Sequence, residues 1–256
     1  MAERPASSYR EMAPPPALAE HVECLWIHRL GDGERIYRQP VFPDGRIDLV
    51  AVGDDVAVAG PASRPITQSL APATVTLGVR FRPGAAPALL GAGAPDLRDR
   101  DTALDDLWGR DGAALAERFA DTARWRDRLQ VLVDHLTGRL AEARALDPVA
   151  VGVAAALADE PGRPVAELAS RVGLSERQLR RRVEDAVGHP PRTLARILRF
   201  QRFLDGARAA GPERDLARLA AETGYADQPH LTRESRRLGG LPPGALLAWE
   251  ADRLAG

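Results

Sequence analysis

Hydrophobic positions change their spacing once along this chain of 256 residues, near residue 102. Before that point, short apolar runs alternate with turns rich in glycine, proline and aspartate, which is the pattern of strands joined by tight turns. The clearest apolar runs are Val22–Ile27, Ile47–Val52, Val56–Ala59 and Thr74–Phe81. They predict a small β-barrel or sandwich over residues 17–90.

After residue 102, hydrophobic residues recur at helical spacing and predict one or two amphipathic helices. The residues that define this period are Leu115, Phe119, Leu129, Leu132, Val133, Leu136 and Leu140. The Asp147-Pro148 step interrupts the period, and the chain beyond it is predicted to be helical throughout. The fold class is therefore α+β, with an α+β regulatory domain over residues 17–146 and an all-α domain over residues 147–256. Residues 1–16 contain three consecutive prolines and no apolar segment, so we expect a disordered leader rather than a signal peptide.

The all-α domain contains an internal repeat, spanning Pro164–Pro191 and Leu216–Pro243. Each copy has a short apolar helix, a glycine, a helix-capping residue and a basic helix that ends in a glycine, one further residue and two prolines. The two glycines after the short helix, Gly173 and Gly224, are 51 residues apart. This order of features predicts two helix-turn-helix units, in which the second helix of each unit enters the major groove of DNA.

In the first copy, Ser175 is placed to cap the basic helix, and Gln178 three residues later completes a capping box. At about 100° per residue, arginine side chains gather on the side opposite Leu179 and Val183. The residues predicted to face DNA are Ser175, Arg177, Gln178, Arg180 and Arg181. For the arginines the alternative is a solvated helix face, and for Gln178 a purely structural capping role is equally open.

In the second copy, Asp227 is the predicted cap, and Leu231, Ser235 and Leu238 are predicted to face inward. The residues predicted to face DNA are Gln228, His230, Thr232, Arg233 and Arg236. Arg233 is equivalent to Arg181, and each could donate two hydrogen bonds to one guanine. For His230, packing beneath the helix is an open alternative.

Apolar residues between the copies, at Leu194, Ile197, Leu198 and Leu204, predict a linker helix. Such a helix would hold both units at a fixed spacing. One chain could then occupy successive major grooves, which lie about 34 Å apart.

Residues 150–250 resemble the DNA-binding domain of AraC/XylS-type regulators. The matching motif is Gly224-Tyr225, Asp227, Leu231-Thr232-Arg233 and Gly240-Leu-Pro-Pro243. The resemblance implies a bacterial, cytoplasmic transcription regulator that binds specific sequences in double-stranded DNA. RNA polymerase and a second copy of the chain, in a homodimer, are further candidate partners. The family usually has phenylalanine at Ser235, so we expect a looser second core that a Ser235→Phe substitution would stabilise.

The N-terminal region resembles a compact sensor-like domain of bacterial regulators, on the segments Val22–Trp26, Phe42–Val50 and Gly78–Gly84. Two hypotheses stay open for it: control by a small effector, and a role in dimerisation or protein contact. Candidate pocket residues under the first hypothesis are Trp26, His28, Tyr37, Arg46, Arg80 and Arg82. An ordinary core or surface position is an equally open interpretation for each of them.

The distribution of charge along the chain indicates that its N-terminal and C-terminal parts have different roles. All 35 basic residues are arginine, and residues 161–256 hold 17 of them against 12 acidic residues, whereas residues 1–160 hold 18 against 24. A basic C-terminal third is typical of phosphate binding.

The same composition argues against enzyme chemistry. The absence of lysine excludes a P-loop or a Schiff base. The single Cys24, expected to be a buried core thiol, cannot form an internal disulfide or a four-cysteine zinc site. We therefore expect no catalytic residue, metal or cofactor, and no apolar run reaches the ~18 residues of a membrane span.

Overall fold

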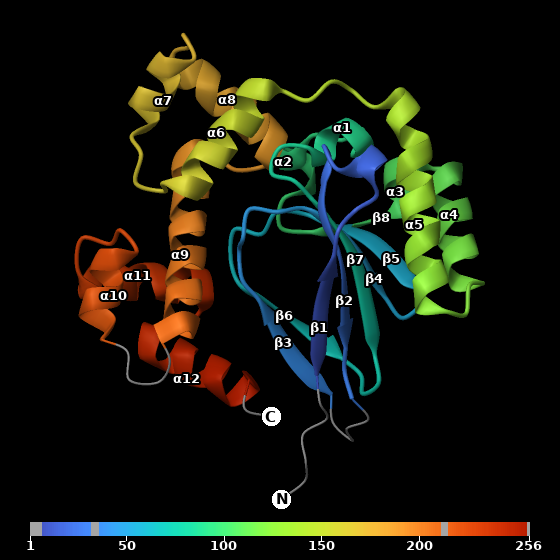
Figure 1. Cartoon of the computed structure of the whole chain (residues 1–256), viewed down its shortest axis with the longest axis horizontal. Coiled ribbons are helices and arrows are strands. Elements are labelled where there is room, and N and C mark those ends of the chain that lie inside the picture. Colours follow the sequence, from blue (N-terminus) through green and yellow to red (C-terminus); the bar gives the residue numbers. More distant parts are fainter. Residues whose placement is uncertain (1–6, 32–35, 211–214, 255–256) are drawn as a thin grey trace, which may run out of the picture.

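The computed structural model describes residues 7–31, 36–210 and 215–254, with side chains up to residue 248. Its N-terminal domain contains a six-stranded antiparallel sheet in the order β1-β2-β7-β4-β5-β8 and a separate two-stranded ribbon, β3-β6 (Figure 1). The strands are β1 (Ser8–Met12), β2 (Val22–Arg29), β3 (Tyr37–Val41), β4 (Asp48–Val52), β5 (Asp55–Ala59), β6 (Ile66–Leu70), β7 (Val75–Phe81) and β8 (Asp101–Ala103). Since no hydrogen bonds join the two sheets among the described strands, the sandwich alternative fits better than a closed barrel.

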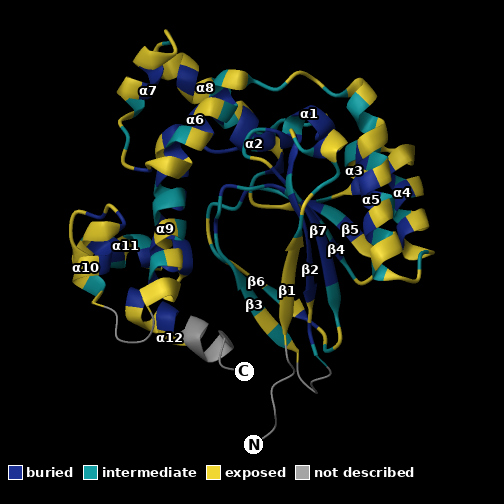
Figure 2. Cartoon of the chain, viewed as in Figure 1, coloured by how far each residue is buried: buried dark blue, intermediate teal, exposed yellow. Residues whose placement is uncertain are grey.

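Successive side chains along each strand point to opposite sides, which gives the six-stranded sheet two different faces. On β2, Leu25 and Ile27 belong to the hydrophobic core, whereas Trp26 and His28 point to the opposite face. Helices cover the core face, and the buried residues lie between them and the sheet (Figure 2). The helices of this domain are α1 (Ala86–Leu90), α2 (Ala94–Leu97), α3 (Leu104–Trp108), α4 (Arg110–Ala120) and α5 (Trp125–Arg139). The uncovered face is therefore free to form one wall of a cavity.

The predicted disordered leader is wrong where the structure describes it. Strand β1 pairs with β2 in the register Tyr9↔His28 and Glu11↔Trp26, and the prolines that follow lead into a 3₁₀ helix, Pro16–Leu18, with Leu18 fully buried. An edge strand is held by backbone hydrogen bonds, so it can form without an apolar run. Residues 1–6 lie outside the described residues.

The C-terminal domain is entirely helical in its described part. Its helices are α6 (Pro148–Asp159), α7 (Val165–Arg171), α8 (Glu176–Val187), α9 (Pro191–Ala210), α10 (Leu216–Glu222), α11 (Gln228–Gly239) and α12 (Pro243–Leu254). Helix α9 runs between two separate hydrophobic cores: Leu194 belongs to the core with α6–α8, and Phe200 belongs to the core with α10–α12. One continuous helix thus packs on both halves of this domain.

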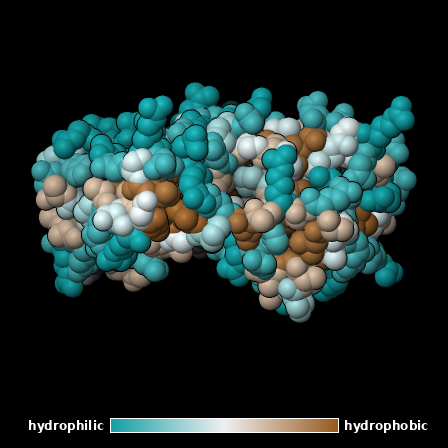
Figure 3. Space-filling view, turned by 90° about the horizontal axis from the view of Figure 1, so that it is seen from above, coloured by the Kyte–Doolittle hydropathy of each residue, from teal (hydrophilic) through white to brown (hydrophobic). Residues whose placement is uncertain are grey.

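The surface seen from above is mostly hydrophilic, with hydrophobic side chains in a few separate patches (Figure 3). None of the described helices is long and apolar enough to cross a bilayer.

Candidate nucleic-acid interface and adjoining cavity

The first helix-turn-helix unit consists of α7 and α8, joined at Gly173, whose φ of 66° is the left-handed conformation that glycine favours. Ser175 caps α8, and the capping box is complete: Gln178 N donates to Ser175 Oγ, and Gln178 Oε1 accepts from Ser175 N at 3.0 Å. The carboxamide oxygen of Gln178 is therefore engaged in holding the start of the helix.

Helix α8 presents arginines on its outer face. Arg177, Arg180 and Arg181 are exposed, whereas Leu179 and Val183 are fully buried on the opposite side. Arg182 differs from its neighbours, because its guanidinium donates to Asp147 at 2.7 and 2.8 Å and so braces the N-terminus of α6.

The second unit repeats this arrangement with α10 and α11, joined at Gly224 with φ 84°. Asp227 caps α11 by accepting from His230 N at 2.6 Å. The predicted contact residues Gln228, Arg233 and Arg236 are exposed, and Thr232 is half-buried with its hydroxyl donating to Gln228 O at 2.9 Å.

His230 lies closer to the turn than to the outer face. Its ring packs edge-on against Tyr225 at 5.3 Å, and its Nδ1 lies 3.4 Å from the backbone nitrogen of Ala226. This placement favours the packing alternative over contact with a base.

The inner face of α11 corrects the expectation of a loose second core. Ser235 faces inward beside Leu231 and Leu238, as predicted, but its hydroxyl donates to Leu241 O at 2.7 Å and the residue is fully buried. A Cβ on nearby Gly239 would lie 2.9 Å from both Phe200 and Leu246, so this region is tightly packed. Serine here makes a hydrogen bond at a site with little spare room.

An ion pair fixes the second unit to the linker helix α9. Arg196 on α9 donates to both carboxylate oxygens of Glu234 on α11, at 2.8 and 2.7 Å. Burial acts to raise the pKa of Glu234, but the hydrogen bonds and positive charge of Arg196, together with the nearby Arg237 and His230, outweigh burial and hold this pKa below its ordinary value. With 20 residues at about 1.5 Å each, α9 is about 30 Å long, close to one turn of duplex DNA.

Two capped helices with exposed arginines, carried on one linker helix, agree with the sequence comparison. Residues 168–248 match the family described as a helix-turn-helix domain. The C-terminal domain is an AraC-type helix-turn-helix domain. Such domains belong to DNA-binding transcription regulators. In the N-terminal domain, residues 10–103 match a family described as a domain of unknown function, DUF6597.

Other comparisons add little to this family assignment. No curated protein is significantly similar to the chain. Among solved structures, ToxT from Vibrio cholerae is similar at 13% identity and a TM-score of 0.43, over 96% of this chain and 98% of that one.

The N-terminal domain contacts the first unit and the linker helix of the AraC-type domain. Arg98 donates to Glu184 on α8 at 3.0 Å, and His189, directly after α8, lies with Nε2 3.1 Å from Ala62 O. Burial lowers the pKa of His189, so its neutral ring can donate to that carbonyl. Further along α9, Gln201 donates to Pro43 O. Sequence reasoning missed these contacts, because nothing in the local pattern marks a contact between distant segments.

A cavity of about 920 Å³ lies on the uncovered face of the sheet, with the β3-β6 ribbon as another wall. Four of the six predicted pocket residues line it, namely Trp26, His28, Arg46 and Arg80; Tyr37 and Arg82 do not. Sequence analysis missed Tyr9, Gln39, Asp48 and Gln68, which also line it. Arg208 of α9 is among the lining residues, so the cavity adjoins the AraC-type domain.

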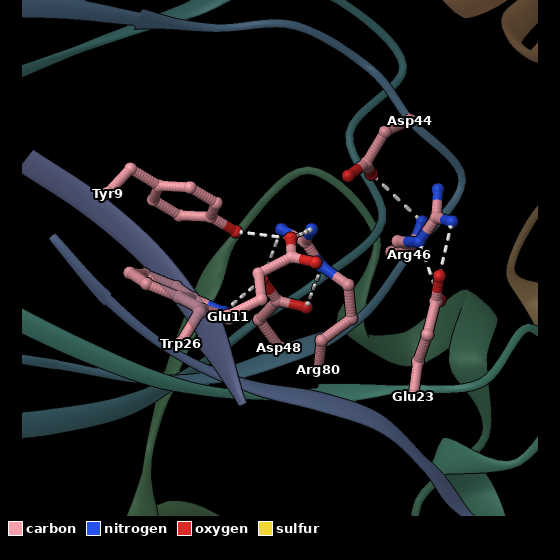
Figure 4. A network of polar contacts seen from close by, with 8 residues as sticks. All are labelled: Tyr9, Glu11, Glu23, Trp26, Asp44, Arg46, Asp48 and Arg80. Atoms are coloured by element: carbon pink, nitrogen blue, oxygen red, sulfur yellow. Dashed lines mark hydrogen bonds and ion pairs between the residues drawn. The ribbon is translucent and has the colours of Figure 1, made fainter. Parts of the chain in front are cut away.

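A network of polar contacts forms the cavity floor (Figure 4). Asp48 accepts from Trp26 Nε1 at 3.2 Å and from Arg80 at 3.0 and 3.2 Å. Arg80 also lies 3.7 Å from Glu11, which accepts from the Tyr9 hydroxyl. Burial raises the pKa of Asp48 to about 6, although Arg80 opposes that shift.

Proposed function

We propose that this chain is a sequence-specific transcription regulator whose helices α8 and α11 read successive major grooves of one duplex. The observation that carries the proposal is the pair of exposed arginine faces on two capped helices, joined by a linker helix about one DNA turn long. The proposed contact residues are those of α8 and α11 predicted above. Of these, Ser175, Gln178, Thr232 and His230 also make structural contacts, and for His230 packing against Tyr225 is the favoured role.

We further propose that a small effector in the N-terminal cavity controls DNA binding. The cavity volume is that of ordinary small-molecule sites. Ala62, which lines the cavity, also contacts His189, directly after the first recognition helix, α8. Arg98, next to the lining residue Asp99, holds Glu184 on that helix. An occupant that shifts these segments would change how the first unit is held, as allosteric coupling between two sites requires.

Selection of bound sequences from random duplexes, carried out with the full chain, tests sequence-specific DNA binding. The wild-type chain should enrich a two-part site, and an Arg181→Ala, Arg233→Ala double variant should lose that enrichment. A stably folded double variant that enriches the same site would contradict the proposal.

A metabolite screen on the full chain tests whether a small effector controls DNA binding. An effector should raise the melting temperature and change affinity for the selected site. A chain that binds no metabolite but self-associates in light scattering would favour the dimerisation alternative instead.

A further inference from the structure

The cavity is balanced in charge. Among the described residues that line it, four are aspartates and four are arginines. Arg80 is paired with Asp48, and Arg46 donates to both oxygens of Glu23 at 2.8 Å. The main charged groups on the cavity floor therefore already have partners of opposite charge. A charged ligand that bound to one of them would have to displace its partner and leave a partly buried charge uncompensated, which is costly.

The sheet provides a flat aromatic surface inside this cavity. Gly78 on β7 lies directly beneath the indole of Trp26, since a Cβ there would be 2.1 Å from Trp26 Cε2. The hydrogen bond from Trp26 Nε1 to Asp48 fixes the ring edge, and Tyr9 lies beside it at 6.1 Å between ring centroids. The indole is thus held flat on the strand, and Trp26, although only 8% exposed, lines the cavity, where a planar ring can pack against it.

The opposite wall offers uncharged hydrogen-bonding groups. In the β3-β6 ribbon, Gln39 lies across from Gln68, and Val41 lies across from Ile66; all four line the cavity. Each carboxamide can both donate and accept a hydrogen bond without carrying charge. The neighbouring Val41 and Ile66 add apolar contact area.

We propose that the cavity binds an uncharged, planar ring compound, which stacks on Trp26 and forms hydrogen bonds with Gln39 and Gln68. This inference rests on the proposed effector control and specifies the chemical class of the effector.

Calorimetry on the full chain with three matched probes tests the ligand class. The probes are 2-naphthamide, 2-naphthoate and 2-naphthylmethylamine, which share one planar ring system and differ in charge at neutral pH. The amide should bind roughly tenfold more tightly than either charged probe. Trp26→Leu and Gln68→Leu should each weaken amide binding, whereas Trp125→Leu, which removes a tryptophan outside the cavity lining, should leave it unchanged.

Three results would overturn the ligand class: equal or tighter binding of a charged probe, no binding of the amide at millimolar concentration, or unchanged amide binding in a folded Trp26→Leu variant. If Trp26→Leu fails to fold, the Gln39→Leu, Gln68→Leu double variant decides in the same way.

DNA affinity, measured alongside, separates this inference from the function on which it rests. If 2-naphthoate is the probe that binds and it alters DNA affinity, the ligand class fails and effector control survives. If the amide binds without altering DNA affinity, the ligand class stands and effector control fails.

Discussion

Adjacent residues of one type have different surroundings on the first recognition helix. Arg181 is exposed on the outer face, whereas the guanidinium of Arg182 is held by Asp147 at the start of α6. The free side chain can form paired hydrogen bonds with a guanine, but the engaged one would first have to release its carboxylate. The two arginines therefore form a matched pair for separating base recognition from structural support.

We expect Arg181→Ala to cost about 1–3 kcal/mol of binding at the selected site and to relax preference at one base position. Arg182→Ala should instead lower the melting temperature and leave base preference unchanged. Titration of both variants with specific and random duplexes checks this. An equal loss on both duplexes for Arg181→Ala would restrict its role to phosphate contact.

Ser235 is the residue at which the structure reverses an expectation from the sequence. Ser235→Ala should cost about 1–3 kcal/mol of unfolding free energy, because Leu241 O loses its hydrogen-bond donor. Ser235→Phe should also destabilise the protein, since the larger ring must displace packed neighbours. The exposed Ser170→Ala is the control in thermal melts. A higher melting temperature for Ser235→Phe would restore the loose-core interpretation.

Asp48 should make stability depend on pH. Its folded pKa of about 6 lies above the ordinary value of 3.8, so the folded state holds its proton more tightly. The associated stability is present below about pH 4 and is lost as the pH rises through 6. The melting temperature of the wild-type chain relative to Asp48→Asn should therefore fall between pH 4 and pH 7, by the equivalent of about 1–3 kcal/mol. Exposed Asp55→Asn is the control, and a pH-independent difference for Asp48→Asn would contradict the raised pKa.

At the scale of elements, Gln178 in the capping box could serve helix stability, base recognition or both. We expect Gln178→Ala to lower stability by about 0.5–2 kcal/mol, because it removes the group that holds the N-terminus of α8. Base preferences in the selection experiment should stay as in the wild type. A changed preference at one position would show that Gln178 also contacts a base.

Elements with a regular hydrophobic period were predictable from sequence. Strands β2, β4, β5 and β7 coincide with the four apolar runs, and helices α4 and α5 with the helical spacing. In the C-terminal domain, the repeat gave the caps and the inward residues of both units, because local rules govern capping and helical faces.

The missed elements lack such a period. Strand β3 has the sequence Tyr-Arg-Gln-Pro-Val and β1 has Ser-Tyr-Arg-Glu-Met, so neither carries a continuous apolar face. Their stability comes from pairing with strands distant in sequence. The cavity was predictable only in part for the same reason: Tyr9, Gln39 and Gln68 lie on these missed strands or on β6, which was missed as well.

At the scale of the whole molecule, contacts from the N-terminal domain span both reading units. Arg98 and Ala62 hold the end of the first unit, and Phe42 packs edge-on against Phe200 in the core of the second at 6.1 Å. A single surface of the N-terminal domain thus spans the linker helix. This arrangement adds to the effect of α9 in keeping the two units at one relative position.

The two units should therefore bind DNA as a rigid pair. Linker helix α9 packs on both cores, and Arg196 pairs with Glu234 across its junction with α11. On a duplex with one two-part site, insertion of about five base pairs between the parts rotates one of them to the far side of the helix. Affinity should fall toward the non-specific level, roughly 10³-fold or more. About ten inserted base pairs should restore little, because a rigid linker cannot extend another turn of about 34 Å. If affinity is retained after the five-pair insertion, the units read independently or one of them dominates. Separate Arg181→Ala and Arg233→Ala variants on the inserted duplex would then identify the dominant unit.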